Sequence, residues 1–233
     1  MTETDVVAAA SGVQLSFGST PALRGASISV ARGELVALTG PSGSGKSTLM
    51  RCLAGVLLPD AGVVTFAGRR LDEMSADERT LLRRRHIGLV LQFGQLVPEL
   101  TALENVALPL LLDGRGRKRA EQAARRWLEQ LEVADRAGIR PPAMSGGEQQ
   151  RVAIARALVT SPDVVLADEP TGSLDTVTGE LALEVLVKAT RETGAALVVV
   201  THDHRVSAWM DREVVLRDGA VDAPLDAAVD AAS

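Results

Sequence analysis

The segment from Gly40 to Ser47 has the residue types and spacing of a loop that holds phosphate groups. Its glycines let backbone N–H groups converge on phosphate oxygens, and a helix that begins directly after such a loop adds partial positive charge. Lys46 is placed to reach β- and γ-phosphates, and Ser47 to hold Mg²⁺. The alternative is a chance glycine and serine loop with a surface lysine. The apolar run before the loop and the helical pattern after it favour a nucleotide site, with the expected contacts Gly40, Pro41, Ser42, Gly43, Ser44, Gly45, Lys46, Ser47 and Thr48.

Two carboxylates, Asp168 and Glu169, follow the apolar run Val164–Ala167. Such a run predicts a buried strand, and open α/β sheets bind ligands at the carboxyl ends of their strands. Asp168 suits a Mg²⁺ role through water, and Glu169 suits a general base that polarises the water attacking a γ-phosphate. An acidic pair could instead cap the next helix. Because the same chain also has the phosphate loop, the catalytic interpretation of the acidic pair is favoured.

A third segment, Ser145 to Arg151, predicts the start of another helix, because Ser145 and Glu148 have capping-box spacing. Gly146 and Gly147 would leave the first N–H groups of this helix open to an anion. One interpretation is simply a well-capped helix. The other is a second phosphate site, far along the chain from the first.

The elements that must position these residues follow from the hydrophobic pattern. Strands are predicted at Val13–Phe17, Ala26–Val30, Glu34–Thr39, Val63–Phe66, His86–Leu91, Val164–Ala167, Ala195–Thr201 and Glu213–Leu216. Helices are predicted at Lys46–Leu57, Ser75–Arg85, Ser145–Thr160 and Thr178–Glu192, and within Thr101–Arg136, where the turn 113–116 interrupts them. Strands alternating with helices indicate an α/β fold with a parallel sheet. We expect a core at 1–92 and 156–222, an inserted helical subdomain at about 93–155, and a flexible tail at 223–233.

Composition limits the possible partners. The net charge of −5 argues against nucleic acid as the main partner. Two basic stretches, 83–85 and 115–126, are either solvated helix faces or contacts with an acidic partner or a lipid surface. The single cysteine, Cys52, fits a reducing compartment. Residues 1–10 lack the basic start of a secretory signal, and no apolar run reaches the roughly 18–20 residues of a membrane span. These features predict a soluble, cytoplasmic protein.

In chain order, these segments resemble the motifs of the ABC ATPases. Ser145 to Arg151 resembles the signature sequence of that family, and the stretch Ser173-Leu174-Asp175 resembles its D-loop. Gln92 stands where the family has the Q-loop glutamine, and His202 resembles the switch histidine. Phe17 lies where the family places an aromatic residue under adenine. The resemblance extends from about Val13 to Val221.

The resemblance implies a single ABC ATPase domain over 1–233: a P-loop NTPase (RecA-like) core with a parallel sheet, an antiparallel β subdomain and an inserted α-helical subdomain. It implies ATP and Mg²⁺, bound in a head-to-tail homodimer, or a dimer of similar subunits, between the phosphate loop of one subunit and the signature of the other. A membrane permease would hold the pair at the inner face of the cell membrane. The implied catalytic residues are Lys46, Gln92, Glu169 and His202; the implied metal site is Ser47, Gln92 and Asp168. Further nucleotide contacts are Phe17, Ser145, Gly146, Gly147, Glu148 and Asp175.

Two of these residues also have simpler interpretations. A lone histidine such as His202 is usually structural, although its place at a strand end beside an acid favours sensing of the γ-phosphate. Phe17 could belong to the hydrophobic core. Stacking of a base on an aromatic ring is worth about 1–3 kcal/mol, and this interpretation of Phe17 is the favoured one.

A narrower resemblance concerns the kind of transporter. The segments Pro170 to Gly179 and Leu100 to Val106 look like those of the lipoprotein-release, macrolide-export and cell-division branch, which implies an exporter or a mechanotransmission complex. An ATPase of an importer is the alternative. A soluble GTPase, kinase or DNA-repair ATPase is a third possibility. A GTPase would need Asn-Lys-x-Asp, but the only asparagine, Asn105, precedes Val106. The transported substrate cannot be read from this chain.

Overall fold

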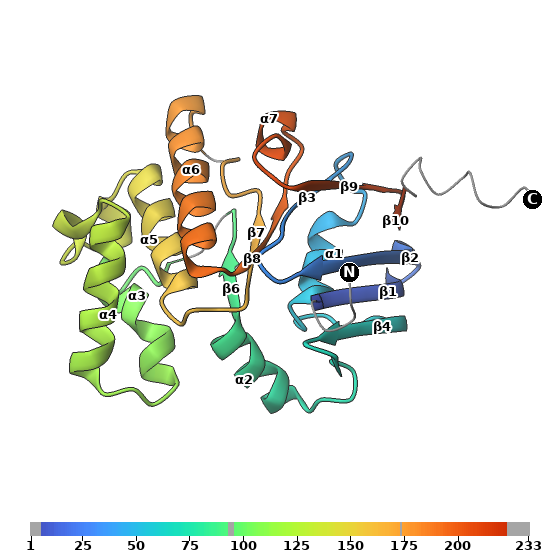
Figure 1. Cartoon of the computed structure of the whole chain (residues 1–233), viewed down its shortest axis with the longest axis horizontal. Helices are drawn as coiled ribbons and strands as arrows, with labels where there is room; N and C mark the ends of the chain where they lie inside the picture. The colour runs from blue at the N-terminus through green and yellow to red at the C-terminus, as the bar shows by residue number, and fades with distance from the viewer. Residues whose placement is uncertain (1–5, 93–95, 173, 223–233) are drawn as a thin grey trace, which may run out of the picture.

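The computed structural model describes residues 6–92, 96–172 and 174–222. Within these ranges the centre of the molecule is a six-stranded sheet (Figure 1). Its strand order is β10 (Ala220–Val221), β9 (Arg212–Arg217), β3 (Leu35–Thr39), β8 (Ala196–Val200), β7 (Val164–Asp168) and β6 (Ile87–Val90). All neighbours are parallel except β10, which is antiparallel to β9. The predicted parallel sheet is confirmed.

A second sheet is antiparallel, as the family resemblance implied. In the described residues it has the order β2 (Thr20–Ala31), β1 (Val6–Phe17), β4 (Ala61–Phe66) and β5 (Arg69–Arg70). The prediction began β1 only at Val13 and β2 only at Ala26. It missed the first half of β1 because the run of alanines at 8–10 has low strand propensity, and the first half of β2 because Pro21 and Gly25 are residue types depleted in strands. These residues are strand because β1 pairs with β2 on one side and β4 on the other.

The helices agree closely with the hydrophobic pattern. They are α1 (Lys46–Leu53), α2 (Ala76–His86), α3 (Ala102–Leu112), α4 (Arg117–Gln130), α5 (Gly146–Leu158), α6 (Thr176–Thr193) and the short α7 (His204–Ser207), which was not predicted. α1 ends earlier than the expected Leu57, because Gly55 adopts a positive φ of 61° just beyond its C-cap. His86 ends α2 and does not belong to β6. None of the helices in the described ranges is long and apolar enough to cross a membrane.

The central sheet separates two hydrophobic clusters, because successive residues of a strand point to opposite faces. Val164 and Leu166 join the cluster that contains α1 and the antiparallel sheet. Val165 and Ala167 join the cluster that α3, α4, α5 and α6 form on the other side (Figure 1). Both faces of β7 and β8 are therefore covered, which explains their continuous apolar sequences. The boundary expected after residue 155 falls inside α5, and the division into subdomains stays a prediction.

Candidate nucleotide site

The phosphate loop connects the end of β3 with the start of α1, as the sequence pattern requires. Gly40 and Gly45 have φ values of 135° and 101°, which favour glycine. Close packing also excludes side chains here. A Cβ at Gly40 would lie 2.0 Å from the carbonyl oxygen of Leu216, and one at Gly45 would lie 2.4 Å from that of Ala22.

The side chain of Lys46 folds back onto the backbone of this loop. Its Nζ donates hydrogen bonds to the carbonyl oxygens of Gly40 (2.8 Å) and Pro41 (2.7 Å). Burial lowers the pKa of Lys46, and the nearby Glu169 and Asp168 oppose that shift. In the same loop, Ser44 Oγ is buried and has no hydrogen-bond partner within the described structure. The hydrogen bonds of this cation go to neutral carbonyl oxygens, and the nearby hydroxyl is unused, so both groups fit an anionic phosphate.

The predicted metal residues Ser47 and Asp168 are in contact. Ser47 Oγ donates to Asp168 Oδ1 over 2.9 Å, which joins the start of α1 to the end of β7. Burial raises the pKa of Asp168, against the opposing effects of Ser47 and Arg51. Hydroxyl and carboxylate oxygens are hard donors of the kind that Mg²⁺ prefers, so the residues present fit this ion.

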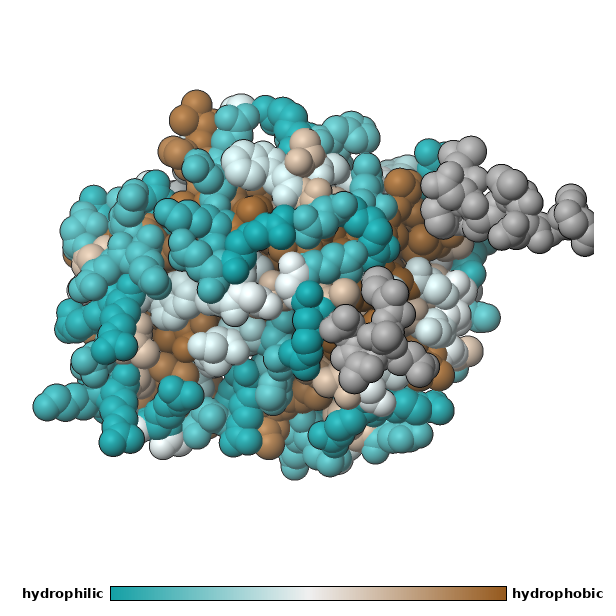
Figure 2. All heavy atoms as spheres, viewed as in Figure 1, coloured by the Kyte–Doolittle hydropathy of each residue, from teal (hydrophilic) through white to brown (hydrophobic). Residues whose placement is uncertain are grey.

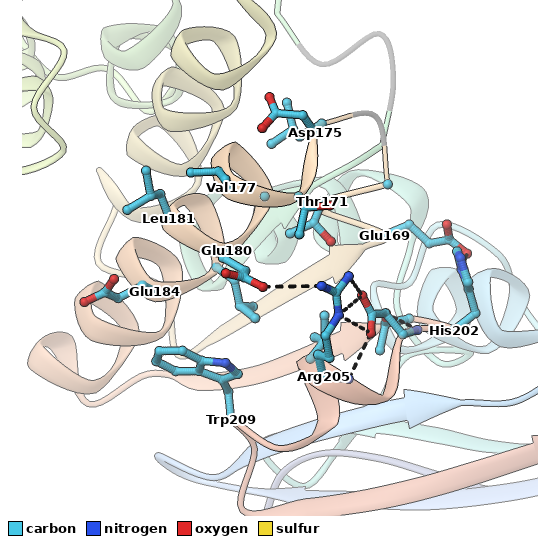
Figure 3. Close-up of a pocket in the computed structure, with 18 residues that line it drawn as sticks. Glu169, Thr171, Asp175, Val177, Glu180, Leu181, Glu184, His202, Arg205 and Trp209 are labelled. Atoms are coloured by element: carbon cyan, nitrogen blue, oxygen red, sulfur yellow. Dashed lines mark hydrogen bonds and ion pairs between the residues drawn. The ribbon is translucent and has the colours of Figure 1, made fainter.

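Glu169 and His202 form the second half of the site. His202 Nδ1 lies 3.0 Å from Glu169 Oε1, and Figure 3 shows the two side chains meeting at the edge of a neighbouring cavity. Glu169 has a φ of 45°, uncommon for a residue other than glycine, and its N–H donates to the carbonyl of Val200 (2.9 Å). The backbone therefore fixes where the Glu169 side chain leaves the end of β7, and the contact with His202 positions its carboxylate.

The Gln92 amide and the Glu169 carboxylate both lie close to the backbone of Gly172. A Cβ at Gly172 would lie 2.8 Å from Gln92 Nε2 and 3.1 Å from Glu169 Oε2. A side chain at position 172 would collide with the amide and crowd the carboxylate, so a glycine is needed for both groups to keep these positions. Sequence reasoning did not assign Gly172 to the site, and a glycine closely following the acidic pair was the available signal.

One open cavity of about 890 Å³ is lined by most of the residues predicted to contact the nucleotide. Phe17 at its rim is 55% exposed, which rules out the core interpretation of this side chain. Ala22, from β2, was not predicted, since nothing in the local sequence marks it. The lining residues are Phe17, Ala22, Gly40, Pro41, Ser42, Gly43, Gly45, Lys46, Ser47, Thr48, Gln92, Glu169 and His202.

The signature segment lies outside that cavity. Ser145 Oγ accepts from the N–H of Glu148 (3.3 Å), and Glu148 Oε2 accepts from the N–H of Ser145 (2.8 Å), so the capped-helix interpretation is confirmed. Glu148 also pairs with Arg136 at 2.8 Å. A Cβ at Gly147 would lie 2.4 Å from Thr178 Cγ2, so α5 packs directly against α6. None of the signature residues Ser145, Gly146, Gly147 and Glu148 lines the nucleotide cavity.

Asp175 is likewise separated from the phosphate loop. It caps α6 by accepting from the N–H (3.0 Å) and the Oγ1 (2.6 Å) of Thr178. It lines the second cavity, of about 680 Å³, which shares Glu169 and His202 with the first (Figure 3). Ser173, the first residue of the expected D-loop, lies outside the described residues.

Comparison with known proteins gives a consistent result. A family model for ABC transporters matches residues 23–172. The lipoprotein-releasing system ATP-binding protein LolD 2 of Caulobacter vibrioides is 48% identical over 202 residues, which cover 87% of this chain and 89% of that protein. LolD of Maricaulis maris is also 48% identical over 202 residues, with coverages of 87% and 88%. These relatives confirm the resemblance to the lipoprotein-release branch.

A solved structure agrees in three dimensions. A dimeric ATP-binding cassette in a post-hydrolysis state, bound to ADP and Pi, superposes with a TM-score of 0.85 at 39% identity. The match covers 93% of this chain and 97% of that one. The described fold and phosphate loop are thus those of a known class of ATPase. This chain belongs to the ABC transporter family, as an ATP-binding subunit that hydrolyses ATP.

Proposed function

We propose that this chain drives a membrane permease of the lipoprotein-release type as a head-to-tail homodimer at the inner face of the membrane, in an export or mechanotransmission complex. One observation carries the proposal: the phosphate loop, Glu169 and His202 share one cavity, while the signature Ser145–Gly147 lies outside it. A chain in which these parts are separate needs a second copy to bring them together. The names of the relatives support lipoproteins as the cargo class.

Each residue then has a role in hydrolysis. The loop N–H groups and Lys46 bind the phosphates, and Phe17 stacks on the adenine. Ser47 and Asp168, with Gln92 nearby, would hold Mg²⁺, which when bound neutralises phosphate charge. Glu169 accepts the proton of the attacking water.

His202 holds the carboxylate of Glu169 in place, as the 3.0 Å contact between them supports. Ser145, Gly146, Gly147 and Glu148 of the second copy present a helix N-terminus to the γ-phosphate, and Asp175 lies beside the same interface. Hydrolysis removes the group that joins the two copies, which converts chemistry into movement.

The test is a capture experiment with the Glu169→Gln variant as bait. This variant should bind Mg-ATP without hydrolysing it and so hold the closed dimer. The bait is added to detergent-solubilised native membranes, and copurifying proteins are identified by mass spectrometry. Lys46→Ala, which should not retain ATP, is the matched control.

Three outcomes separate the alternatives. Capture of a permease with a large extracytoplasmic domain supports the proposal. Capture of a many-helix permease with a solute-binding protein would replace export with import. An ATP-dependent dimer that captures no membrane protein would leave the ATPase intact and overturn the proposed coupling to a permease.

A further inference from the structure

The outward side of α4 carries basic side chains that the nucleotide site does not use. Ala120, Ala124 and Leu128 are the buried residues of this helix. At 3.6 residues per turn, the cations of α4 at 118, 119, 125 and 126 project away from that buried stripe. They and the arginine of the preceding turn are exposed, and none has an ion pair within the described residues. These side chains form the basic face: Arg115, Lys118, Arg119, Arg125 and Arg126.

The acids nearest to the basic face are already paired with other arginines. Asp113, in the turn before α4, contacts Arg85 at 2.6 Å, and this hydrogen bond lowers the pKa of Asp113. Glu121 contacts Arg117 at 2.7 Å. The other acid of α4 is Glu129, which is exposed and lies at the far end of the helix. The basic face therefore keeps its positive charge in a chain whose net charge is −5.

Exposed leucines adjoin the same turn. Leu111 and Leu112 end α3 and are 36% and 59% exposed. Arg84 of α2 donates to the carbonyl oxygen of Leu112 (2.6 Å), which brings a further cation beside them. α4 lies at the outer edge of the molecule, and Figure 2 shows this left-hand edge covered by hydrophilic side chains. Cations flanked by leucines are the composition of a surface that rests on a lipid headgroup layer.

We propose that the basic face binds the anionic headgroups of a bilayer, with Leu111 and Leu112 reaching its acyl boundary. Complementary charge favours this partner, and exposed leucines would find no matching apolar surface on a nucleic acid backbone. The inference rests on the proposed function only for placing the subunit beside a membrane. Each basic residue brought to an anionic surface strengthens binding about fivefold, so the loss of three should weaken it about a hundredfold.

The experiment is cosedimentation of the purified full chain with vesicles. Vesicles of phosphatidylcholine containing phosphatidylglycerol are compared with vesicles of phosphatidylcholine alone, at low and at high salt. The test variant is Arg115→Gln/Lys118→Gln/Arg119→Gln. The control, Arg24→Gln/Arg69→Gln/Lys188→Gln, removes the same charge from exposed positions elsewhere.

We expect binding to the anionic vesicles only, lost at high salt and weakened about a hundredfold in the test variant but not in the control. Equal weakening in both variants, or no vesicle binding by the wild-type chain, would overturn the proposal. Binding of duplex DNA in place of vesicles, through the same residues, would also overturn it. The test variant should still form the ATP-dependent dimer and capture the permease, so a failure here leaves the proposed function standing.

Discussion

At the scale of single residues, Glu169 shows how the backbone prepares the residue that we propose as the catalytic base. Its left-handed φ of 45° costs on the order of 1–3 kcal/mol. The hydrogen bond from its N–H to Val200 and the contact with His202 hold it in this conformation. The gain is a carboxylate whose position at the nucleotide cavity is set by contacts within the chain itself. We therefore expect this side chain to need little rearrangement before hydrolysis.

The partner of that carboxylate gives the first prediction. His202→Ala should lower kcat for ATP hydrolysis about a hundredfold, because Glu169 loses the group that orients it as a base. KM for ATP should change little, since the phosphate loop is untouched. His204→Ala, an exposed histidine outside both cavities, is the matched control in the same steady-state assay. A rise in KM with unchanged kcat would show that His202 acts in binding instead.

Asp168 gives a prediction with a defined pH dependence. Burial raises its pKa, so the folded chain binds a proton more readily than the unfolded chain. The free energy of unfolding should therefore fall as pH rises from the ordinary aspartate range, near 4, through the raised value. Asp168→Asn should remove this fall in the free energy of unfolding, because asparagine carries no charge at any of these pH values. In thermal melts without nucleotide, the variant should have the higher Tm at neutral pH and little advantage at acid pH, while its hydrolysis rate falls. An unchanged Tm at neutral pH would contradict the burial argument.

At the scale of elements, three helices begin with the same capping box. The side chains of Ser75, Thr101 and Ser145 each accept a hydrogen bond from the backbone N–H of a glutamate in the first turn. The carboxylate of that glutamate accepts one from the backbone N–H of the capping residue. Replacing any of the three by alanine should cost about 1 kcal/mol of stability in urea unfolding. Only Ser145→Ala should also raise the ATP concentration needed to dimerise the Glu169→Gln variant, measured by light scattering. If Thr101→Ala weakens dimerisation equally, the special role of Ser145 is lost.

The elements also show why most of the fold could be predicted. β7 and β8 are continuous apolar runs, and the capping boxes mark helix starts within the local sequence. The outer halves of β1 and β2 are strand because of pairing across the antiparallel sheet, which local propensity does not record. The short α7 depends on Asp203, which caps it by accepting from the N–H of Arg205. Four residues carry too little periodicity to be recognised.

At the scale of the whole molecule, the site divides into parts that are local in sequence and parts that are not. The phosphate loop, Asp168 and Glu169 lie in short segments whose chemistry is visible in the residue types. Ala22 enters the site through close approach between distant elements, so no local pattern identifies it, whereas Gly172 is marked only by its place shortly after the acidic pair. The place of the signature in the site is also not visible within one chain, because the phosphate loop that it is expected to face lies on another copy.

A mixing experiment tests that last arrangement. Lys46→Ala disables the phosphate loop, and Ser145→Arg disables the signature, so neither variant alone should hydrolyse ATP at a shared site. In a head-to-tail dimer of the two, one site combines both lesions, and the other is intact. An equal mixture should therefore recover about a quarter of the wild-type rate if the copies assort at random and the two sites act independently. A site built within a single chain would show no recovery, because each chain would keep its own lesion. Circular dichroism of each variant confirms that its fold is kept, and a mixture no more active than its separate components would contradict the shared site.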